Sequence, residues 1–146
     1  CIGAMGHANQ VALEVACQSP KKRIYVLDGD GAVLMHMGNL ATMAKIAPPN
    51  IHYILINNFV HESVGGQETA SKYIDMSILA ASCKFYKYYF TSDETNLKSQ
   101  FHQYINDPFS FLEIVVCPGS RSDLGRPKLE LNTLKNHFMS SIIDSK

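Results

Sequence analysis

The chain has 146 residues, of which 46% are hydrophobic and 18% are charged, a composition typical of one globular domain with its own core. Thirteen basic and thirteen acidic residues cancel, so the charge balance argues against a nucleic-acid partner. No apolar run approaches the roughly 20 residues that cross a bilayer, and no signal peptide is visible. The four cysteines form no CxxC pair, which predicts reduced thiols in the cytoplasm rather than disulfides or a zinc site.

The first half of the chain alternates helical and strand patterns. Small apolar residues at helical spacing predict a helix over residues 7–17, and β-branched residues predict a strand over residues 23–28. An apolar stripe predicts a second helix over residues 34–46, which two prolines end before a strand over residues 51–56. Residues 58–69 are polar and rich in glycine, which indicates a functional loop.

The second half continues the alternation. Helical spacing and an acidic N-cap predict helices over residues 71–82 and 93–105, with an aromatic strand over residues 85–90 between them. A strand over residues 111–116, a Gly/Ser/Arg loop and a helix over residues 133–143 complete the chain. This order predicts an α/β fold in three layers, with a parallel sheet and helices on both faces.

Polar residues follow the first two predicted strands. Gly29, Asp30 and Gly31 come after one strand, and Asn57 and Asn58 come after the next. Ligands of open parallel sheets collect at the carboxyl ends of strands, so the two groups are expected to meet. Carboxylate and amide oxygens suit Mg²⁺, and the glycines let backbone N–H groups approach a phosphate. The pattern predicts a magnesium-diphosphate site, although Gly-Asp-Gly alone is equally consistent with a tight turn.

Three further segments carry recognisable chemistry. Residues 3–6 read Gly-Ala-Met-Gly before a helix, which alone is consistent with a simple turn and a buried methionine. Residues 61–67 read His-Glu-Ser-Val-Gly-Gly-Gln directly after the asparagines, where glycines and a hydroxyl suit an anion. Residues 121–127 read Arg-Ser-Asp-Leu-Gly-Arg-Pro.

Together these segments, over residues 3–127, resemble the thiamine diphosphate-dependent decarboxylase superfamily. The segments at 61–67 and 121–127 resemble its phosphonopyruvate decarboxylase family and the closely related sulfopyruvate decarboxylases. The resemblance implies the thiamine diphosphate-binding fold, with thiamine diphosphate and Mg²⁺ as cofactors. It also implies a small anionic 2-oxo acid substrate. The implied reaction converts phosphonopyruvate to phosphonoacetaldehyde and carbon dioxide in 2-aminoethylphosphonate biosynthesis.

The resemblance also assigns roles to the cofactor-binding positions. It implies that Asp30, the Asn58 side chain and the Val60 carbonyl bind Mg²⁺. Met5 would wedge between the two cofactor rings, and Gly3 would accept a hydrogen bond from the aminopyrimidine. The implied cofactor-binding residues are Gly3, Met5, Gly29, Asp30, Gly31, Ala32, Asn58 and Val60. Phe59 departs from the pattern, because small residues are expected after the asparagines.

Catalytic and substrate-binding roles are assigned by position beside that site. His61 is the candidate catalytic residue, acting on the substrate carboxylate or on a transferred proton, although a loop histidine without a chemical role is an alternative. Arg121 and Arg126 suit bidentate binding of a phosphonate, or else a surface loop or subunit contact. The candidate substrate-binding residues are Ser63, Gly65, Gln67, Arg121 and Arg126.

The resemblance also predicts what this sequence lacks. In the superfamily a glutamate on a separate pyrimidine-binding domain of the neighbouring subunit activates the cofactor. Residues 1–146 match only the diphosphate-binding domain, so we expect a piece of a longer chain or one subunit of an oligomer, inactive without a pyrimidine-binding partner. The alternatives are a sulfopyruvate decarboxylase subunit and a noncatalytic phosphate-binding module. A nucleotide-binding Rossmann domain is disfavoured, because no GxGxxG follows the first strand.

Overall fold

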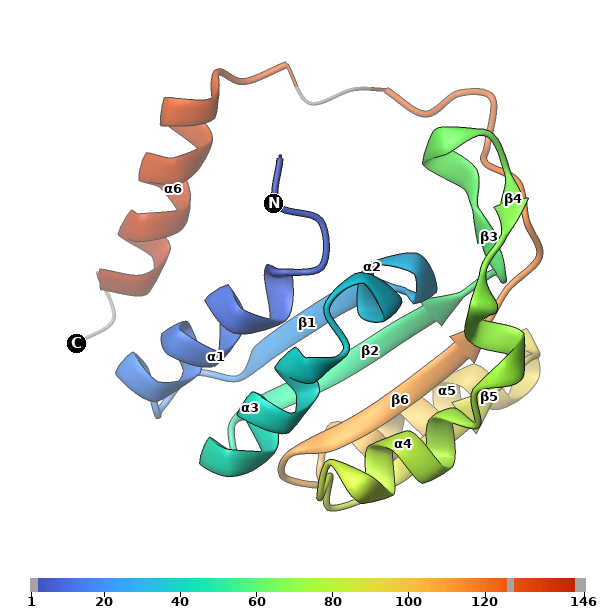
Figure 1. Ribbon diagram of the computed structural model, residues 1–146. Helices are drawn as coiled ribbons and strands as arrows, with labels where there is room; N and C mark the ends of the chain where they lie inside the picture. The colour runs from blue at the N-terminus through green and yellow to red at the C-terminus, as the bar shows by residue number, and fades with distance from the viewer. Residues whose placement is uncertain (1–2, 126–127, 144–146) are drawn as a thin grey trace.

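The computed structural model describes residues 3–125 and 128–143, and its centre is a parallel sheet of four strands (Figure 1). The strands, in spatial order, are β1 (Ile24–Gly29), β2 (Ile51–Asn57), β6 (Ser110–Val115) and β5 (Tyr88–Thr91). In the β1–β2 register, Gly29 lies opposite Ile56. The segments that follow these two strands therefore leave the sheet side by side, as expected.

Helices cover both faces of this sheet, which confirms the three-layer α/β fold. Figure 1 shows α1 (Ala8–Gln18), α3 (Gly38–Ile46) and α4 (Met76–Ser82) on the near face and α5 (Glu94–Tyr104) behind it. The last helix, α6 (Leu131–Ile143), stands apart near α1. Within the described residues no helix is both long enough and apolar enough to span a bilayer.

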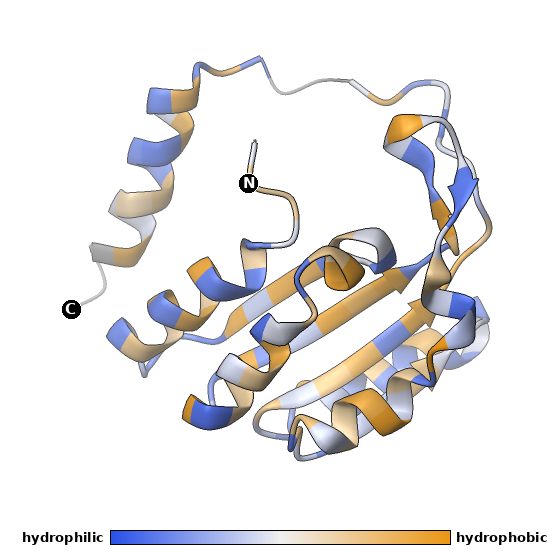
Figure 2. Cartoon of the chain, viewed as in Figure 1, coloured by the Kyte–Doolittle hydropathy of each residue, from blue (hydrophilic) through white to orange (hydrophobic). Residues whose placement is uncertain are grey.

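The strand alternation divides the core between the two faces. Tyr53 and Leu55 of β2 pack with α1, α3 and α4, whereas Ile54 packs with Leu112 and with Tyr104 of α5. All five side chains are buried. Burial of both faces explains why the central strand β2 reads as an almost continuous apolar run, and Figure 2 shows the strands as mostly hydrophobic.

The single helix predicted over residues 34–46 was wrong, because two helices occupy this region. The helix α2 (Asp30–Met35) begins four residues earlier than predicted, and α3 follows after a break at His36 and Met37. His36 has non-helical dihedral angles, φ −138° and ψ 48°. The glycine that begins α3 favours this break, since glycine is a poor helix former. Asp30 therefore lies in the first turn of a helix.

Residues 58–69 form a compact hairpin rather than an irregular loop. Its strands β3 (Val60–His61) and β4 (Gln67–Glu68) pair antiparallel around a 3₁₀ turn, η1 (Glu62–Val64). A second 3₁₀ turn, η2 (Ala70–Tyr73), follows directly. The hairpin brings the chain back over the end of β2, since the Thr69 N–H donates to the Phe59 carbonyl at 2.9 Å.

Two more predicted elements are shorter in the structure. The helix predicted over residues 71–82 is split by Asp75, which caps α4 by accepting from the Ser77 and Ile78 N–H groups. The strand predicted over residues 85–90 begins only at Tyr88, after Lys84 takes a left-handed φ of 58°. The acidic cap predicted for α5 is confirmed, since Asp93 accepts from the Asn96 N–H at 2.9 Å. Hydrogen bonds from the Thr95 hydroxyl and from the backbone and side-chain amides of Asn96 lower the pKa of the Asp93 carboxyl to about 2.

Candidate functional site

A cavity of about 250 Å³ opens at the carboxyl end of the sheet. Three separate segments line it: the N-terminal loop, the β1–α2 turn and the β3–β4 hairpin. The predicted site residues that line it are Met5, Gly29, Asp30, Gly31, Ala32, Asn58, Val60, His61 and Ser63. The fold therefore brings together most of the residues that the sequence singles out.

A larger cavity of about 400 Å³ lies between α1, β1 and α6. Its walls are mainly aliphatic and aromatic, including Val11, Leu27 and Phe138. Among the described residues no carboxylate or carboxamide side chain lines it. We therefore assign the chemistry to the smaller cavity, where acid and amide oxygens converge.

Asp30 is the buried acid of the site, with only 2% of its surface exposed. Its Oδ2 accepts hydrogen bonds from the hydroxyls of Thr69 and Ser71, the latter at 2.9 Å. No hydrogen bond to Oδ1 is found in residues 3–125 and 128–143. Two hydroxyl donors thus fix one carboxylate oxygen and leave the other available to a cation.

The two adjacent asparagines lie in different surroundings. Asn57 is buried, and its Nδ2 donates to Glu113 Oε1 at 2.7 Å while its Oδ1 lies 3.2 Å from Ser71 Oγ. Asn58 lines the cavity, and its Nδ2 donates to Glu62 Oε2 at 2.9 Å. Because Glu62 takes the amide donor of Asn58, the amide oxygen has the defined orientation that a metal ligand needs. The same oxygen accepts from the Val60 N–H at 3.2 Å.

Phe59 makes the turn that returns the chain to the cavity. Its φ is +61°, a left-handed conformation that is uncommon for a bulky residue. The Asn57 side chain accepts from the Phe59 N–H at 3.3 Å, and the Phe59 carbonyl accepts from Thr69. The departure noted in the sequence thus corresponds to a constrained turn, which places Val60 and His61 on the cavity wall.

Met5, Gly31 and His61 meet although they come from three segments. A Cβ atom added to Gly31 would lie 2.7 Å from His61 Nδ1 and 3.6 Å from Met5 Cε. The absence of a side chain at position 31 therefore makes room for both neighbours. Gly3 has a φ of +72° and is exposed, and it does not line the cavity.

Gly6 packs the N-terminal loop closely against α2, a contact that the sequence analysis missed. Its φ is +83°, and an added Cβ would lie 2.8 Å from the Ala32 carbonyl oxygen and 2.6 Å from His36 Nδ1. Both the backbone conformation and the close approach require glycine. The rings of His7 and His36 lie 4.0 Å apart beside this contact. The loop that carries Met5 is therefore held by packing on α2.

The remaining predicted residues lie away from the cavity. Gly65 and Gln67 are exposed in the hairpin. Arg121 is also exposed, and its guanidinium binds both oxygens of Asp123, at 2.9 and 3.2 Å. Arg126 lies outside the described residues. In the described part of the chain, no group of three or more His, Cys, Asp or Glu side chains is placed to hold a metal ion.

Burial raises the pKa of one acid and two phenols near the site. Burial raises the pKa of the Asp28 carboxyl, which accepts from the Tyr53 hydroxyl at 2.8 Å. Burial and the nearby Asp28 carboxylate raise the pKa of Tyr53 well above its usual range. Burial also raises the pKa of Tyr88, whose hydroxyl donates to Glu113. These phenols remain hydrogen-bond donors, and Asp28 is held away from the cavity by Tyr53.

Thr69, Ser71 and Glu113 are the site residues that the sequence analysis missed. Glu113 carried a usable signal, since it is the one charged residue in an otherwise apolar strand segment at residues 111–116. The two hydroxyl residues carried none, because Ser and Thr are common at helix starts.

Comparison with known proteins was consistent with this geometry. Residues 1–114 match the model of the family described as thiamine pyrophosphate enzyme, C-terminal TPP binding domain. The chain is 36% identical over 138 residues to a phosphonopyruvate decarboxylase of Streptomyces hygroscopicus, covering 94% of this chain and 34% of that protein. The enzyme of the same name from Streptomyces viridochromogenes is 37% identical over 142 residues, covering 97% of this chain and 36% of that protein.

A second group of relatives is shorter. The sulfopyruvate decarboxylase subunit beta of Methanothermobacter thermautotrophicus is 37% identical over 92 residues, covering 63% of this chain and 49% of that protein. The chain thus spans about a third of the length of the phosphonopyruvate decarboxylases it matches.

Proposed function

Because this chain belongs to the thiamine pyrophosphate enzymes, through their C-terminal cofactor-binding domain, we propose that the cavity at the carboxyl end of the sheet binds thiamine diphosphate through Mg²⁺. The observation that carries this proposal is the state of Asp30, which is buried with one oxygen fixed by two hydroxyls and the other left for a cation. Mg²⁺ takes oxygen ligands and usually shares them with phosphate. The residues present fit this ion.

We assign the metal to Asp30, the Asn58 amide oxygen and the Val60 carbonyl, all from residues that line the cavity. Gly31 and Ala32 lie in the first turn of α2, where backbone N–H groups have no partner within the helix. Together with Gly29, which leaves open space on the cavity side of the turn, they are suited to hold the diphosphate. Met5, beside Gly31, is the proposed wedge between the cofactor rings, with Gly3 as the proposed acceptor.

The proposed reaction is the nonoxidative decarboxylation of phosphonopyruvate to phosphonoacetaldehyde and carbon dioxide. Thiamine diphosphate, when bound, supplies the electron sink for the loss of carbon dioxide. His61 lies on the cavity wall, where its ring can hold or deliver a proton at the reacting carbon. Ser63 on the same wall is the best placed of the proposed substrate-binding residues.

The arginines have weaker support in this chain. Arg121 is occupied by Asp123 and does not line the cavity, so binding a substrate anion would require it to leave that partner. We retain Arg121, Gly65 and Gln67, together with Arg126, which lies outside the described residues, as proposed substrate contacts.

Catalysis by this domain is proposed to require a second, pyrimidine-binding domain, present either in the same chain or as a separate subunit of an oligomer. The relatives named phosphonopyruvate decarboxylase are about three times longer than the matched region and others are named as beta subunits, which supports both arrangements. The described cysteines Cys17, Cys83 and Cys117 are free thiols, which favours the reducing cytoplasm.

The proposal is tested by cofactor binding in the enzyme assembled with its pyrimidine-binding domain. Asp30→Asn should weaken binding of Mg²⁺ with thiamine diphosphate by at least about a hundredfold. Removing the charge of a metal ligand should reduce metal affinity more than removing a residue that only hydrogen-bonds to a ligand, which costs about ten- to a hundredfold. The matched control is Asp28→Asn, which makes the same change at a buried acid held by Tyr53. Calorimetric titration should give wild-type affinity for the control. Equal affinity in wild type and Asp30→Asn would support a noncatalytic module instead.

The substrate is tested by turnover with phosphonopyruvate and with sulfopyruvate. We expect phosphonopyruvate to be preferred. The matches to the phosphonopyruvate decarboxylases extend over 94% and 97% of this chain, whereas the match to the sulfopyruvate decarboxylase subunit beta extends over 63%. The second candidate is sulfopyruvate decarboxylation, because relatives named sulfopyruvate decarboxylase subunit beta also match this chain. Turnover by the purified chain without a pyrimidine-binding domain would contradict the need for that partner.

A further inference from the structure

We propose that Glu113 is a positioning residue for the metal site, acting through Asn57 and Ser71 to orient Asp30. This inference rests on the proposed function, since it assumes that Asp30 binds a cation. Glu113 lies on β6, two strands away from the β1–α2 turn that carries Asp30. It does not line the cavity, so any effect on the metal must pass through other side chains.

The connection is a chain of hydrogen-bond contacts between buried groups. Glu113 Oε1 accepts from Asn57 Nδ2 at 2.7 Å, and Asn57 Oδ1 lies 3.2 Å from Ser71 Oγ. Ser71 Oγ in turn lies 2.9 Å from Asp30 Oδ2. Each of these four side chains belongs to a residue that is at most 5% exposed. We call this set, Glu113–Asn57–Ser71–Asp30, the acid relay.

Glu113 is the charged partner that orients the relay. A carboxylate only accepts hydrogen bonds, so it takes the NH₂ end of the Asn57 amide and turns the amide oxygen toward Ser71. The Phe59 N–H, 3.3 Å from Asn57 Oδ1, favours the same orientation. The Ser71 hydroxyl carries one proton, which it can donate to Asn57, to Asp30 or to Thr69, but to only one of them at a time. Ser71 therefore couples the Asn57 amide to the Asp30 carboxylate.

The burial of Glu113 argues against a purely structural role. An acid at this depth is costly unless both oxygens have partners, and an apolar residue is often at least as stabilising at such a position. Here the second oxygen accepts from the Tyr88 hydroxyl, so the carboxylate is satisfied on both sides. The residues on either side of Glu113 in β6 are Phe111, Leu112, Ile114 and Val115, so packing in this part of the strand does not require an acid.

The test compares three variants in the enzyme assembled with its pyrimidine-binding domain, by titrating Mg²⁺ at saturating thiamine diphosphate. Glu113→Leu removes both acceptors and should weaken Mg²⁺ binding about tenfold, the usual size of an effect from behind a ligand. Glu113→Gln should rescue the affinity to within about threefold of wild type, because its carbonyl can still accept from Asn57 while its amide donates to the Tyr88 oxygen.

Ser110→Ala is the control on the same strand. It removes a buried hydroxyl that donates to main-chain carbonyls at the other end of β6, so it should lower stability and leave Mg²⁺ affinity unchanged. If Glu113→Leu does not fold, Asn57→Ser cuts the relay one link closer and should give the same tenfold loss. The proposal is overturned if the wild type binds Mg²⁺ and the variant that breaks the relay binds it equally. It is also overturned if Glu113→Gln loses as much affinity as Glu113→Leu. Wild-type protein that binds no cofactor overturns the proposed function instead.

Discussion

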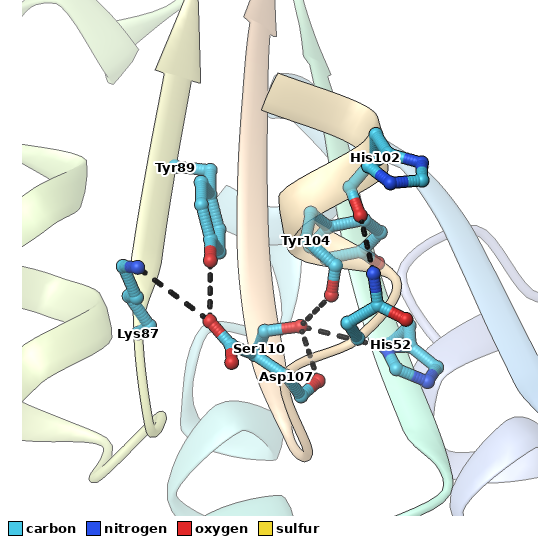
Figure 3. A network of polar contacts seen from close by, with 8 residues as sticks. His52, Lys87, Tyr89, His102, Tyr104, Asp107 and Ser110 are labelled. Atoms are coloured by element: carbon cyan, nitrogen blue, oxygen red, sulfur yellow. Dashed lines mark hydrogen bonds and ion pairs between the residues drawn. The ribbon is translucent and has the colours of Figure 1, made fainter. Parts of the chain in front are cut away.

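The two ends of the main sheet both carry buried polar networks, yet the networks are built differently. At the amino end, Ser110 Oγ donates to the main-chain carbonyls of Tyr104 and Asp107, at 3.1 Å each (Figure 3). At the carboxyl end, side chains bind one another across four elements and stop at Asp30, whose Oδ1 stays free among the described residues. The first network closes the turn between α5 and β6. The second holds the Asp30 carboxylate in place.

Figure 3 shows that the amino-end network extends from Ser110 and Asp107 to Lys87 and Tyr89. The Tyr89 hydroxyl donates to Asp107, which also lies 3.6 Å from the Lys87 ammonium. His52 is buried, and its Nδ1 lies 3.4 Å from Ser110 Oγ. The amino-end network ends on backbone atoms and contributes to stability, whereas the carboxyl-end network ends on the carboxylate that we propose as a metal ligand. Mutations at the two ends should therefore affect different quantities.

After the loss expected for Asp30→Asn, the largest effect is again expected at the carboxyl end, in Gly31→Ala. The added Cβ would approach His61 Nδ1 to 2.7 Å, so the ring must swing into the cavity or out of it. We expect thiamine diphosphate binding to weaken by about tenfold, or about 1.4 kcal/mol. The unfolding free energy should hold or rise slightly, because alanine favours the helix more than glycine does.

His61→Ala provides the second arm of a double-mutant cycle for this contact. With the ring removed, adding Gly31→Ala should cost little further cofactor affinity, and calorimetry on all four proteins gives the coupling. Equal losses from Gly31→Ala with and without His61 would show that the two residues do not interact. That result would remove the argument for a close approach at this point of the cavity.

The next effect in size concerns stability at the amino end, in Tyr104→Phe. Tyr104 is fully buried, and its hydroxyl has no hydrogen-bond partner among the described residues. Removing an unsatisfied buried hydroxyl should raise the unfolding free energy by about 1 kcal/mol. Urea unfolding measures the change, with cofactor affinity as the quantity that should not move. A loss of stability would mean that the hydroxyl has a partner.

The smallest expected effect is a dependence of stability on pH, also at the amino end. Burial, aided by the positive charge of Arg23, lowers the pKa of His52 below its ordinary value of 6.5. The unfolded chain therefore binds a proton that the folded chain excludes, so the unfolding free energy should fall as the pH drops below 6.5 and toward the folded pKa. Above 6.5 this contribution is fully present.

His52→Gln isolates that contribution. Urea unfolding of both proteins at about pH 7.5 and about pH 5.5 should show a shallower pH dependence in the variant, because the other histidines contribute equally to both. The same pH dependence in the two proteins would contradict the prediction.

Much of the fold was predictable because it rests on local patterns. The alternation of apolar helices and strands predicted the parallel sheet, and the strand ends predicted that Asp30 and Asn58 would meet. The helix over residues 34–46 was wrong because a stripe of apolar residues does not reveal a single non-helical residue such as His36. Asp75 could have been recognised as a cap, since aspartate is a preferred N-cap residue.

The candidate site was predictable only where a motif is contiguous. The segments around Asp30 and Asn58 are short and self-contained, whereas Glu113 reaches Asn57 from a strand 56 residues away in sequence. No local pattern reports that β6 lies between β2 and β5. Contacts of that kind depend on strand order, which the hydrophobic pattern leaves open.

The strand order has a consequence for how the molecule folds. Among the described residues β6 is the last strand, yet it lies inside the sheet, and β5 pairs with the sheet only through β6. Until residues 110–115 dock, β5 has no partner and Asn57 lacks its carboxylate acceptor. Such late, distant pairings are slow to form, because the chain must close a long loop before they stabilise it. We therefore expect the sheet and the acid relay to form in the same folding step. A nascent chain that ends before β6 would lack both the complete sheet and the carboxylate of the relay.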